Sequence, residues 1–171
     1  MNFIIDLSFW HYHTEKGKKS LCRQIYEAYR ETKENFIITN SNEEFEKVFK
    51  QVAGKNYEKF KILRNFPDFE RLIILDPYAD KELTKEIVKE NENFFVGGIV
   101  DVVRIKQATK MLARYLGISE KFPSYKIVYK GSAFSFPDRI NFIVKVIVKI
   151  KNCLDVEKAI EESLKEFKKS F

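Results

Sequence analysis

The stretch Phe94-Phe-Val-Gly-Gly-Ile-Val-Asp101 decides how the rest of the sequence is interpreted. Its pattern indicates a buried apolar strand that runs into two glycines and ends on a carboxylate. Glycine lets the backbone come close to a ligand or turn with a positive φ. Ligands of open α/β sheets bind beyond the carboxyl ends of the strands, so the aspartate is a candidate for ligand chemistry.

Two similar strand ends lie on either side of this stretch in the sequence. Leu72-Ile-Ile-Leu-Asp-Pro77 precedes it, and Tyr125-Lys-Ile-Val-Tyr-Lys-Gly-Ser132 follows it. Three strands that open onto small or acidic residues predict a single pocket.

The composition indicates one globular domain with a polyanionic partner or a heavily charged surface. The chain has 171 residues and a formal net charge of +6, carried mainly by lysine. Such an excess favours nucleic acid, but a lysine- and glutamate-rich surface of the hyperthermophile kind explains it equally well. No apolar run approaches the length of a membrane span, so we expect a soluble cytoplasmic protein.

The cysteines and histidines predict no metal site. Cys22 and Cys153 are far apart and have no metal-ligand spacing. His11 and His13 alternate around Tyr12, as two residues on one side of an extended segment would. Without a nearby ligand pair, we interpret them as surface or RNA-facing histidines.

Strand and helix patterns alternate along the chain, which predicts an α/β fold with a mostly parallel sheet and helices on both faces. The residues after 138 alternate like a strand, but their polar positions share one helical face, and Ser135-Phe-Pro-Asp138 offers a helix cap. We therefore predict a helix there. Strands are expected at 2–8, 36–39, 60–63, 71–75, 94–101 and 125–130, and helices at 15–33, 42–53, 80–91, 104–116, 138–152 and 155–168.

Three segments together resemble a known family. They are Ile74–Asp80, Phe95–Asp101 and Gly131–Asn141, and their order and spacing resemble the archaeal branch of the SPOUT-superfamily tRNA methyltransferases that modify nitrogen 1 of the purine at nucleotide 9. The segments Phe3–Ser8 and Ser20–Ile25 agree with the family's first strand and first helix.

The resemblance implies a deep trefoil knot at the carboxyl end, over about 94–152, within a single catalytic domain that spans 1–171. It also implies that the chain lacks the amino-terminal tRNA-binding domain of its archaeal relatives and works as a monomer. S-adenosylmethionine would lie in the knot. The positions that match the family's cofactor walls are Leu75, Asp76, Pro77, Gly97, Gly98, Phe122, Pro123, Gly131, Ser132, Phe134, Phe136 and Pro137.

The resemblance assigns catalytic positions to Asp101, Asp6 and Gln24. For guanosine, Asp101 would take the proton from nitrogen 1. For adenosine, which has a free lone pair there, it would orient the base through its exocyclic amine or counter the sulfonium charge. Its alternative role is to cap the following helix. Asp6 would shape the target pocket or, as an alternative, tie down the amides of a loop.

Basic residues at helical spacing are the expected tRNA phosphate track. As an alternative, these residues form a solvated helix face. Arg104 comes after Val102 and Val103, whereas the family has a basic residue directly after the aspartate. The residues of the track are Lys16, Lys19, Arg23, Arg30, Arg104, Lys106, Lys110 and Arg114.

The predicted function is S-adenosylmethionine-dependent methylation of nitrogen 1 of adenosine or guanosine at nucleotide 9 of tRNA. One alternative is a SPOUT methyltransferase that acts on another RNA. A second is an RNA-binding module that keeps the fold and has no catalysis. A third, a doubly wound nucleotide-binding protein without a knot, is disfavoured because the phosphate-binding glycine pattern is missing.

Overall fold

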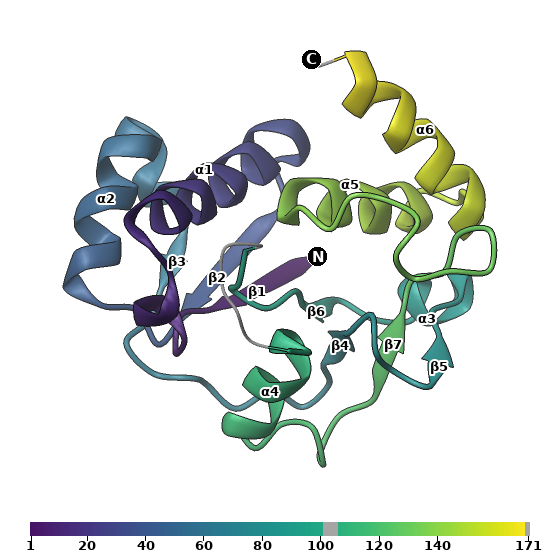
Figure 1. Cartoon of the computed structure of the whole chain (residues 1–171), viewed down its shortest axis with the longest axis horizontal. Helices are drawn as coiled ribbons and strands as arrows, with labels where there is room; N and C mark the ends of the chain where they lie inside the picture. Colours follow the sequence, from purple (N-terminus) through teal and green to yellow (C-terminus); the bar gives the residue numbers. More distant parts are fainter. Residues whose placement is uncertain (101–105, 170–171) are drawn as a thin grey trace.

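The computed structural model describes residues 1–100 and 106–169. Its described part contains a seven-stranded sheet in which every pair of neighbours is parallel, in the order β3-β2-β1-β6-β4-β7-β5 (Figure 1). The strands are β1 (Asn2–Asp6), β2 (Asn35–Thr39), β3 (Lys61–Ile62), β4 (Ile73–Leu75), β5 (Lys81–Glu82), β6 (Asn93–Phe95) and β7 (Ser124–Lys126).

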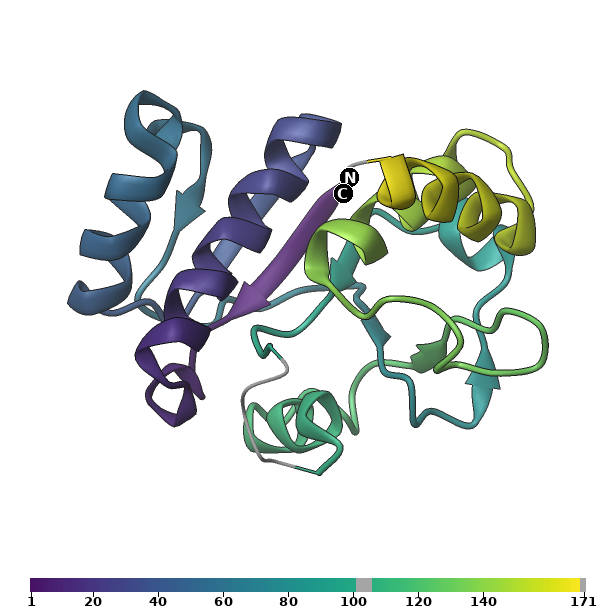
Figure 2. The ribbon, with the colours of Figure 1, turned by 45° about the horizontal axis from the view of Figure 1, so that its top comes forward.

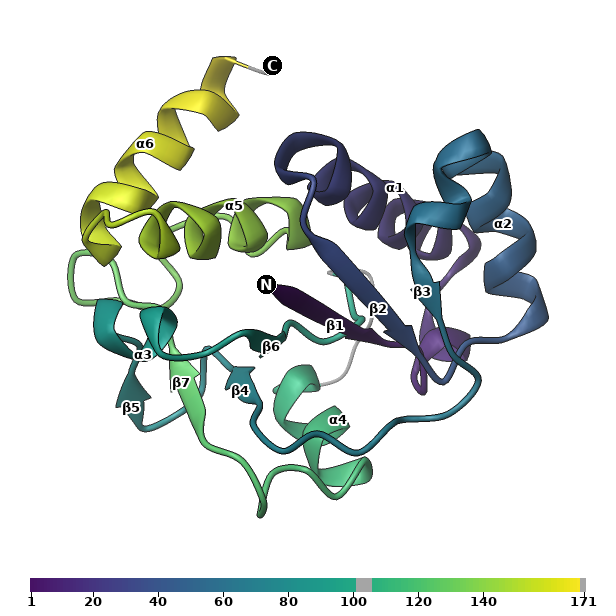
Figure 3. The same cartoon turned by 180° about the vertical axis from the view of Figure 1, so that it is seen from behind.

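Helices cover both faces of the sheet, with α1 and α5 on one face and α4 on the other (Figure 2). The view from behind shows α6 extending beyond α5, away from the sheet (Figure 3). The α-helices are α1 (Glu15–Thr32), α2 (Glu43–Ala53), α3 (Lys85–Lys89), α4 (Ala108–Tyr115), α5 (Ile140–Lys151) and α6 (Val156–Lys169), and two 3-10 helices are η1 (Trp10–Tyr12) and η2 (Gly54–Lys59). No helix of the described residues is long and apolar enough to cross a membrane.

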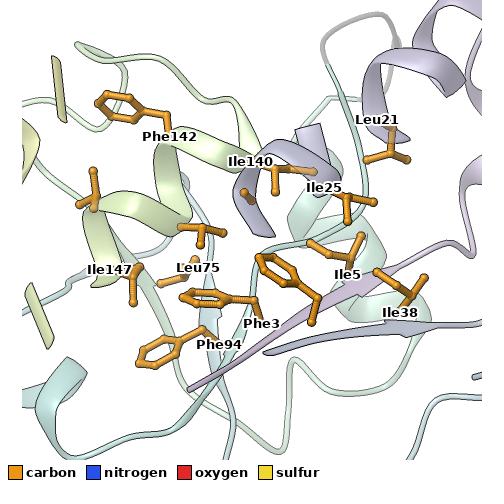
Figure 4. Packing of buried hydrophobic residues seen from close by; sticks show 14 of the residues in the cluster. Phe3, Ile5, Leu21, Ile25, Ile38, Leu75, Phe94, Ile140, Phe142 and Ile147 are labelled. Atoms are coloured by element: carbon orange, nitrogen blue, oxygen red, sulfur yellow. The ribbon is translucent and has the colours of Figure 1, made fainter. Parts of the chain in front are cut away.

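The alternation of side chains along β1 builds the two layers of the core. Phe3 and Ile5 belong to a large buried cluster that includes Ile25 of α1 and Ile147 of α5 (Figure 4). Ile4, between them, belongs to a second cluster with Leu112 of α4. The predicted α/β class and parallel sheet are thereby confirmed.

Two predicted helices begin later than the sequence indicates. The helix expected at 80–91 begins at Lys85, because residues 81–82 pair with β7 and Thr84 caps the helix by accepting a hydrogen bond from the Ile87 N–H. The helix expected at 104–116 begins at Ala108, with Gln107 at its N-cap in the left-handed region.

The predicted cap of α5 is wrong, although the helix itself is confirmed. The Ser135 hydroxyl donates to the Tyr129 carbonyl instead of capping a helix. The helix begins at Ile140, whose N–H donates to Gln24 Oε1 of α1 at 3.0 Å. The strand expected at 125–130 is also shorter, because β7 ends at Lys126. The expected knot passes through residues 101–105, outside the described residues, and stays a prediction.

The segment after β6 is held tightly against β1. β6 is the central strand, between β1 and β4. Beyond it, the Val96 N–H donates to the Ile4 carbonyl at 3.0 Å, and the Asp6 N–H donates to the Gly97 carbonyl at 3.3 Å. A Cβ on Gly98 would lie 1.9 Å from the Asp6 carbonyl oxygen. Glycine is therefore required at 98 for the two backbones to pass each other.

We expect Gly98→Ala to lower the free energy of unfolding by roughly 3 kcal/mol or more, because a backbone must shift to admit the methyl group. Gly117→Ala is the matched control, since Gly117 has a positive φ of 72° but open space around its Cβ position. That control should lose only about 1 kcal/mol. Urea denaturation measures both, and equal losses would contradict the close approach.

Candidate functional site

A cavity of about 410 Å³ opens at the carboxyl ends of the central strands. Its walls come from the chain after β4, β6 and β7, from the start of α4 and from the first turn of α5. Its volume is within the range of small-molecule sites, and its place at the end of β6 is where open α/β sheets bind ligands. The lining includes Leu75, Tyr78, Val96, Ile99, Val100, Thr109, Tyr125, Ile127, Asp138 and Ile143.

Five of the sequence-predicted cofactor residues line this cavity: Leu75, Asp76, Pro77, Phe134 and Phe136. Asp76 is buried, and its Oδ1 accepts a hydrogen bond from the Tyr78 N–H at 3.0 Å, which holds the turn after β4. The rings of Tyr78 and Phe134 lie 5.1 Å apart and are largely exposed, so they form an aromatic pair at the rim of the cavity.

The two glycines shape the cavity through their backbone and are not part of its lining. Gly97 has a φ of 89°, and a Cβ there would come within 3.4 Å of Thr109 Oγ1 in the first turn of α4. Gly98 faces the backbone of β1. Their neighbours Val96 and Ile99 line the cavity instead.

Gly131 and Ser132 belong to a tight turn. Lys130 and Gly131 both have positive φ, 51° and 77°, and the N–H groups of Tyr129 and Ser132 each donate to the other residue's carbonyl. Positive φ at both central positions is the pattern of a type I′ turn. This turn returns the chain so that Ala133 and Phe134 reach the cavity.

Phe122 and Pro123 line a different cleft, between the strand ends and α4, together with Lys110 and Arg114. Asp76 borders both hollows. Pro137 lies between two residues of the cavity lining, Phe136 and Asp138, without being part of it. The structure thus brings together the residues after β4 and the Phe134–Phe136 segment, and separates Phe122 and Pro123 from them.

Asp6 lies at the end of β1, fully buried. Its carboxylate accepts hydrogen bonds from the Ser8 N–H, from Thr39 Oγ1 at 2.6 Å and from Asn40 Nδ2 at 2.9 Å. These contacts join the carboxyl ends of β1 and β2. Such contacts fit the alternative role of Asp6, in which it ties down a loop. None of the three hydrogen-bond partners lines the cavity.

Gln24 is likewise occupied by structural contacts. Its Nε2 donates to Ser20 Oγ at 3.1 Å, while its Oε1 accepts from the Ile140 N–H. The side chain therefore caps α5 from α1 and fixes the start of the helix that carries Ile143 into the cavity wall. No local motif could reveal this, because the two residues are far apart in the sequence.

Asp101 and Arg104 lie outside the described residues. Val100, the residue before Asp101, lines the cavity and donates its N–H to His13 Nε2 at 3.2 Å. The helix that follows, α4, has Gln107 at its N-cap.

His13 is buried, which corrects the interpretation of a surface histidine; His11 is exposed as expected. Residues 10–12 form a 3-10 helix rather than an extended segment, and this turns His13 inward. Burial lowers the pKa of His13, against the hydrogen bonds to the Trp10 and Phe9 carbonyls, which raise it. No cluster of metal-ligand side chains occurs among the described residues.

The described basic residues of the expected phosphate track form two groups, which lie on opposite faces of the sheet. Lys16, Lys19, Arg23 and Arg30 are exposed on α1, and Arg30 pairs with Glu27 at 2.6 Å. Lys106, Lys110 and Arg114 lie before and along α4, on the other face of the sheet. Lys110 Nζ donates to the Tyr78 carbonyl at 3.0 Å, next to the cavity rim.

A parallel sheet with a ligand-sized cavity beyond its central strands is the arrangement of α/β proteins that bind small molecules at the strand ends. A family profile described as tRNA (guanine(9)-N(1))-methyltransferase TRM10/TRM10A matches residues 1–168. The chain belongs to this family.

Two archaeal proteins are similar to this chain in sequence. A tRNA (guanine(9)-/adenine(9)-N1)-methyltransferase of Thermococcus kodakarensis is 30% identical over 159 residues, covering 86% of this chain and 42% of that protein. A tRNA (adenine(9)-N1)-methyltransferase of Sulfolobus acidocaldarius is 38% identical over 98 residues, covering 57% and 32%. This chain thus spans less than half the length of both curated relatives. A crystal structure of dual specific Trm10 from Thermococcus kodakaraensis has a TM-score of 0.82 at 28% identity, covering 95% of this chain and 99% of that one.

The buried His13 predicts an acid-sensitive stability. Its lowered folded-state pKa means that the unfolded chain binds more protons once the pH falls below about 6.5, so stability is lost from there downward. One such group contributes a slope of at most about 1.4 kcal/mol per pH unit. Urea denaturation from about pH 8 to 5 should show this loss in the wild type and a flatter curve in His13→Gln. Parallel curves would contradict it.

Proposed function

We propose that this chain catalyses S-adenosylmethionine-dependent methylation of nitrogen 1 of the purine at nucleotide 9 of tRNA, acting as a monomer. The observation that carries the proposal is the cavity at the end of β6, whose lining comes largely from the three segments on which the resemblance rests. Membership of the family supplies the reaction class.

The residues of the cavity suit an adenosyl cofactor. Leu75, Ile99 and Ile127 offer apolar walls, and main-chain groups at the strand ends offer hydrogen-bond partners for an adenine edge. Tyr78 and Phe134 would cover the bound molecule at the rim. When bound, the cofactor supplies an electrophilic methyl group on a sulfonium.

The chain's own contribution to methyl transfer is positioning. When two reactants are bound in line with each other, their reaction becomes effectively unimolecular, and this lowers the barrier to methyl transfer. The strand ends that carry Leu75 and Val96 are hydrogen-bonded in the sheet, so they hold one wall at a fixed place. We assign Asp101 as the residue that receives the guanosine proton or orients adenosine, since it follows Val100 of the cavity wall.

The phosphate track is proposed to begin next to the cavity. Lys106 precedes α4 and Lys110 lies in its first turn, which lines the cavity. On α1, Lys16 and Lys19 lie in the first turns, which begin at the carboxyl edge of the sheet. Arg30 lies about 20 Å farther along that helix and is paired with Glu27. We therefore assign the early lysines to tRNA contact ahead of Arg30.

Mass spectrometry of tRNA after incubation with this protein and isotope-labelled S-adenosylmethionine tests the function. The expected result is labelled 1-methyladenosine or 1-methylguanosine at nucleotide 9. Label at another nucleotide or in ribosomal RNA would favour a different RNA target. Salt-sensitive tRNA binding without label would favour an RNA-binding module that has no catalysis.

The cavity, rather than the neighbouring cleft, should hold the cofactor. Phe134→Ala removes an aromatic ring from the rim and should weaken S-adenosylhomocysteine binding by about tenfold, roughly 1.4 kcal/mol. Phe122→Ala, in the other cleft, is the matched control and should leave the affinity unchanged. Isothermal titration calorimetry measures both, and the opposite order would place the ligand in the cleft.

Asp101→Asn distinguishes proton removal from orientation. If the carboxylate accepts the guanosine proton, the variant should lose about 10²- to 10⁴-fold in guanosine methylation, and far less in adenosine methylation. Single-turnover rates on tRNA transcripts that carry A9 or G9 measure the difference. Equal losses on both purines would contradict the role of a base.

A further inference from the structure

We propose that His13 is a positioning residue for the cavity: its neutral imidazole holds the main chain at Val100 and thereby fixes the wall formed by Ile99 and Val100. The identity of the ligand in this cavity rests on the proposed function, while the contact itself is a property of the fold.

The hydrogen bonds of His13 select one tautomer. Its Nδ1 lies 3.1 Å from the Trp10 carbonyl oxygen, which can only accept, so Nδ1 carries the proton. Its Nε2 lies 3.2 Å from the Val100 N–H, which can only donate, so Nε2 is the acceptor. A protonated imidazole has no acceptor and would leave the Val100 N–H without its partner.

The imidazole is held by a rigid frame. Trp10, in η1, is fully buried, and its Nε1 donates to Glu44 Oε1 of α2 at 3.0 Å. Its ring packs edge-on against Phe45 at 5.5 Å between centroids. Lys18 of α1 forms an ion pair with the same Glu44. His13 therefore links the cavity wall to a frame formed by η1, α1 and α2.

His13 extends the anchoring of this wall beyond β1. Hydrogen bonds to β1 fix the chain at Val96 and Gly97, and close packing fixes Gly98. Val100 is tied to His13 instead. Ile99, between the two anchors, is half-buried and lines the cavity, so its position depends on both.

Burial biases the imidazole toward the neutral form, and a nearby positive charge adds to this. Burial lowers the pKa of His13, and the charge of Lys18 on α1 acts in the same direction. Lys18 is itself paired with Glu15 of α1 and Glu44 of α2, and the pair with Glu44 raises the lysine's pKa, so the lysine keeps its charge.

Two variants separate the anchor from simple packing. Glutamine places its amide oxygen near the position of Nε2, so His13→Gln retains an acceptor for the Val100 N–H. Asparagine reaches only the position of Nδ1, so His13→Asn retains the contact to Trp10 and loses the one to Val100. His11→Asn is the control, because it makes the same substitution at an exposed histidine two residues away.

The first readout is amide hydrogen exchange at Val100, followed by NMR without any ligand. We expect His13→Asn to speed exchange by about tenfold or more, and His13→Gln and His11→Asn to stay near the wild-type rate. The second readout is S-adenosylhomocysteine affinity by calorimetry, in which His13→Asn should weaken binding by about tenfold while His13→Gln stays within about threefold.

Unchanged exchange at Val100 in His13→Asn would overturn the proposal. So would faster exchange with unchanged affinity, since the wall would then not depend on the contact. A wild-type protein that does not bind S-adenosylhomocysteine would contradict the proposed function, while the exchange rates would still decide whether His13 anchors the chain. Equal loss in the Gln and Asn variants would indicate packing alone.

Discussion

The close approach of Gly98 to the backbone of Asp6 is the constraint on which the rest of the site depends. β6 lies at the centre of the sheet, and its continuation has to leave the sheet beside β1 without a side chain in between. Because any Cβ at 98 would lie 1.9 Å from a carbonyl oxygen, sterics fix the path of the chain at Gly98, and hydrogen bonds fix it at Val96, Gly97 and Val100. The cavity exists where that path, β4 and β7 diverge.

The other parts of the site are held in place by hydrogen bonds within turns and by a contact between distant segments of the chain. Gln24 fixes the start of α5, the Lys130–Gly131 turn returns the chain toward Phe134, and Asp76 holds the turn after β4. The Gln24 contact joins the start of α5 to a helix packed in the core, and the two turns follow strands β4 and β7 of the sheet. A site built on loops obtains its precision from such supports.

Hydrophobic periodicity was enough to predict the alternating strands and helices, the parallel sheet and a pocket after three strands. The resemblance to the family, rather than periodicity, pointed to Leu75, Asp76, Pro77, Phe134 and Phe136, which line the cavity. Contacts between residues that are distant in the sequence could not be predicted from such patterns. Ser135 has the local pattern of a helix cap, yet Gln24 of α1 performs that role. His13 alternates with His11 in the sequence, but the single turn of η1 buries one and exposes the other. Strand β5 has two exposed residues and therefore no hydrophobic signal.

A crystal structure of this chain with S-adenosylhomocysteine would show whether the cavity beyond β6 is the cofactor site. We expect the ligand between Leu75 and Ile99, with Tyr78 and Phe134 closing over it. A ligand bound in the cleft beside Phe122 and Arg114, with the cavity free of it, would contradict the account.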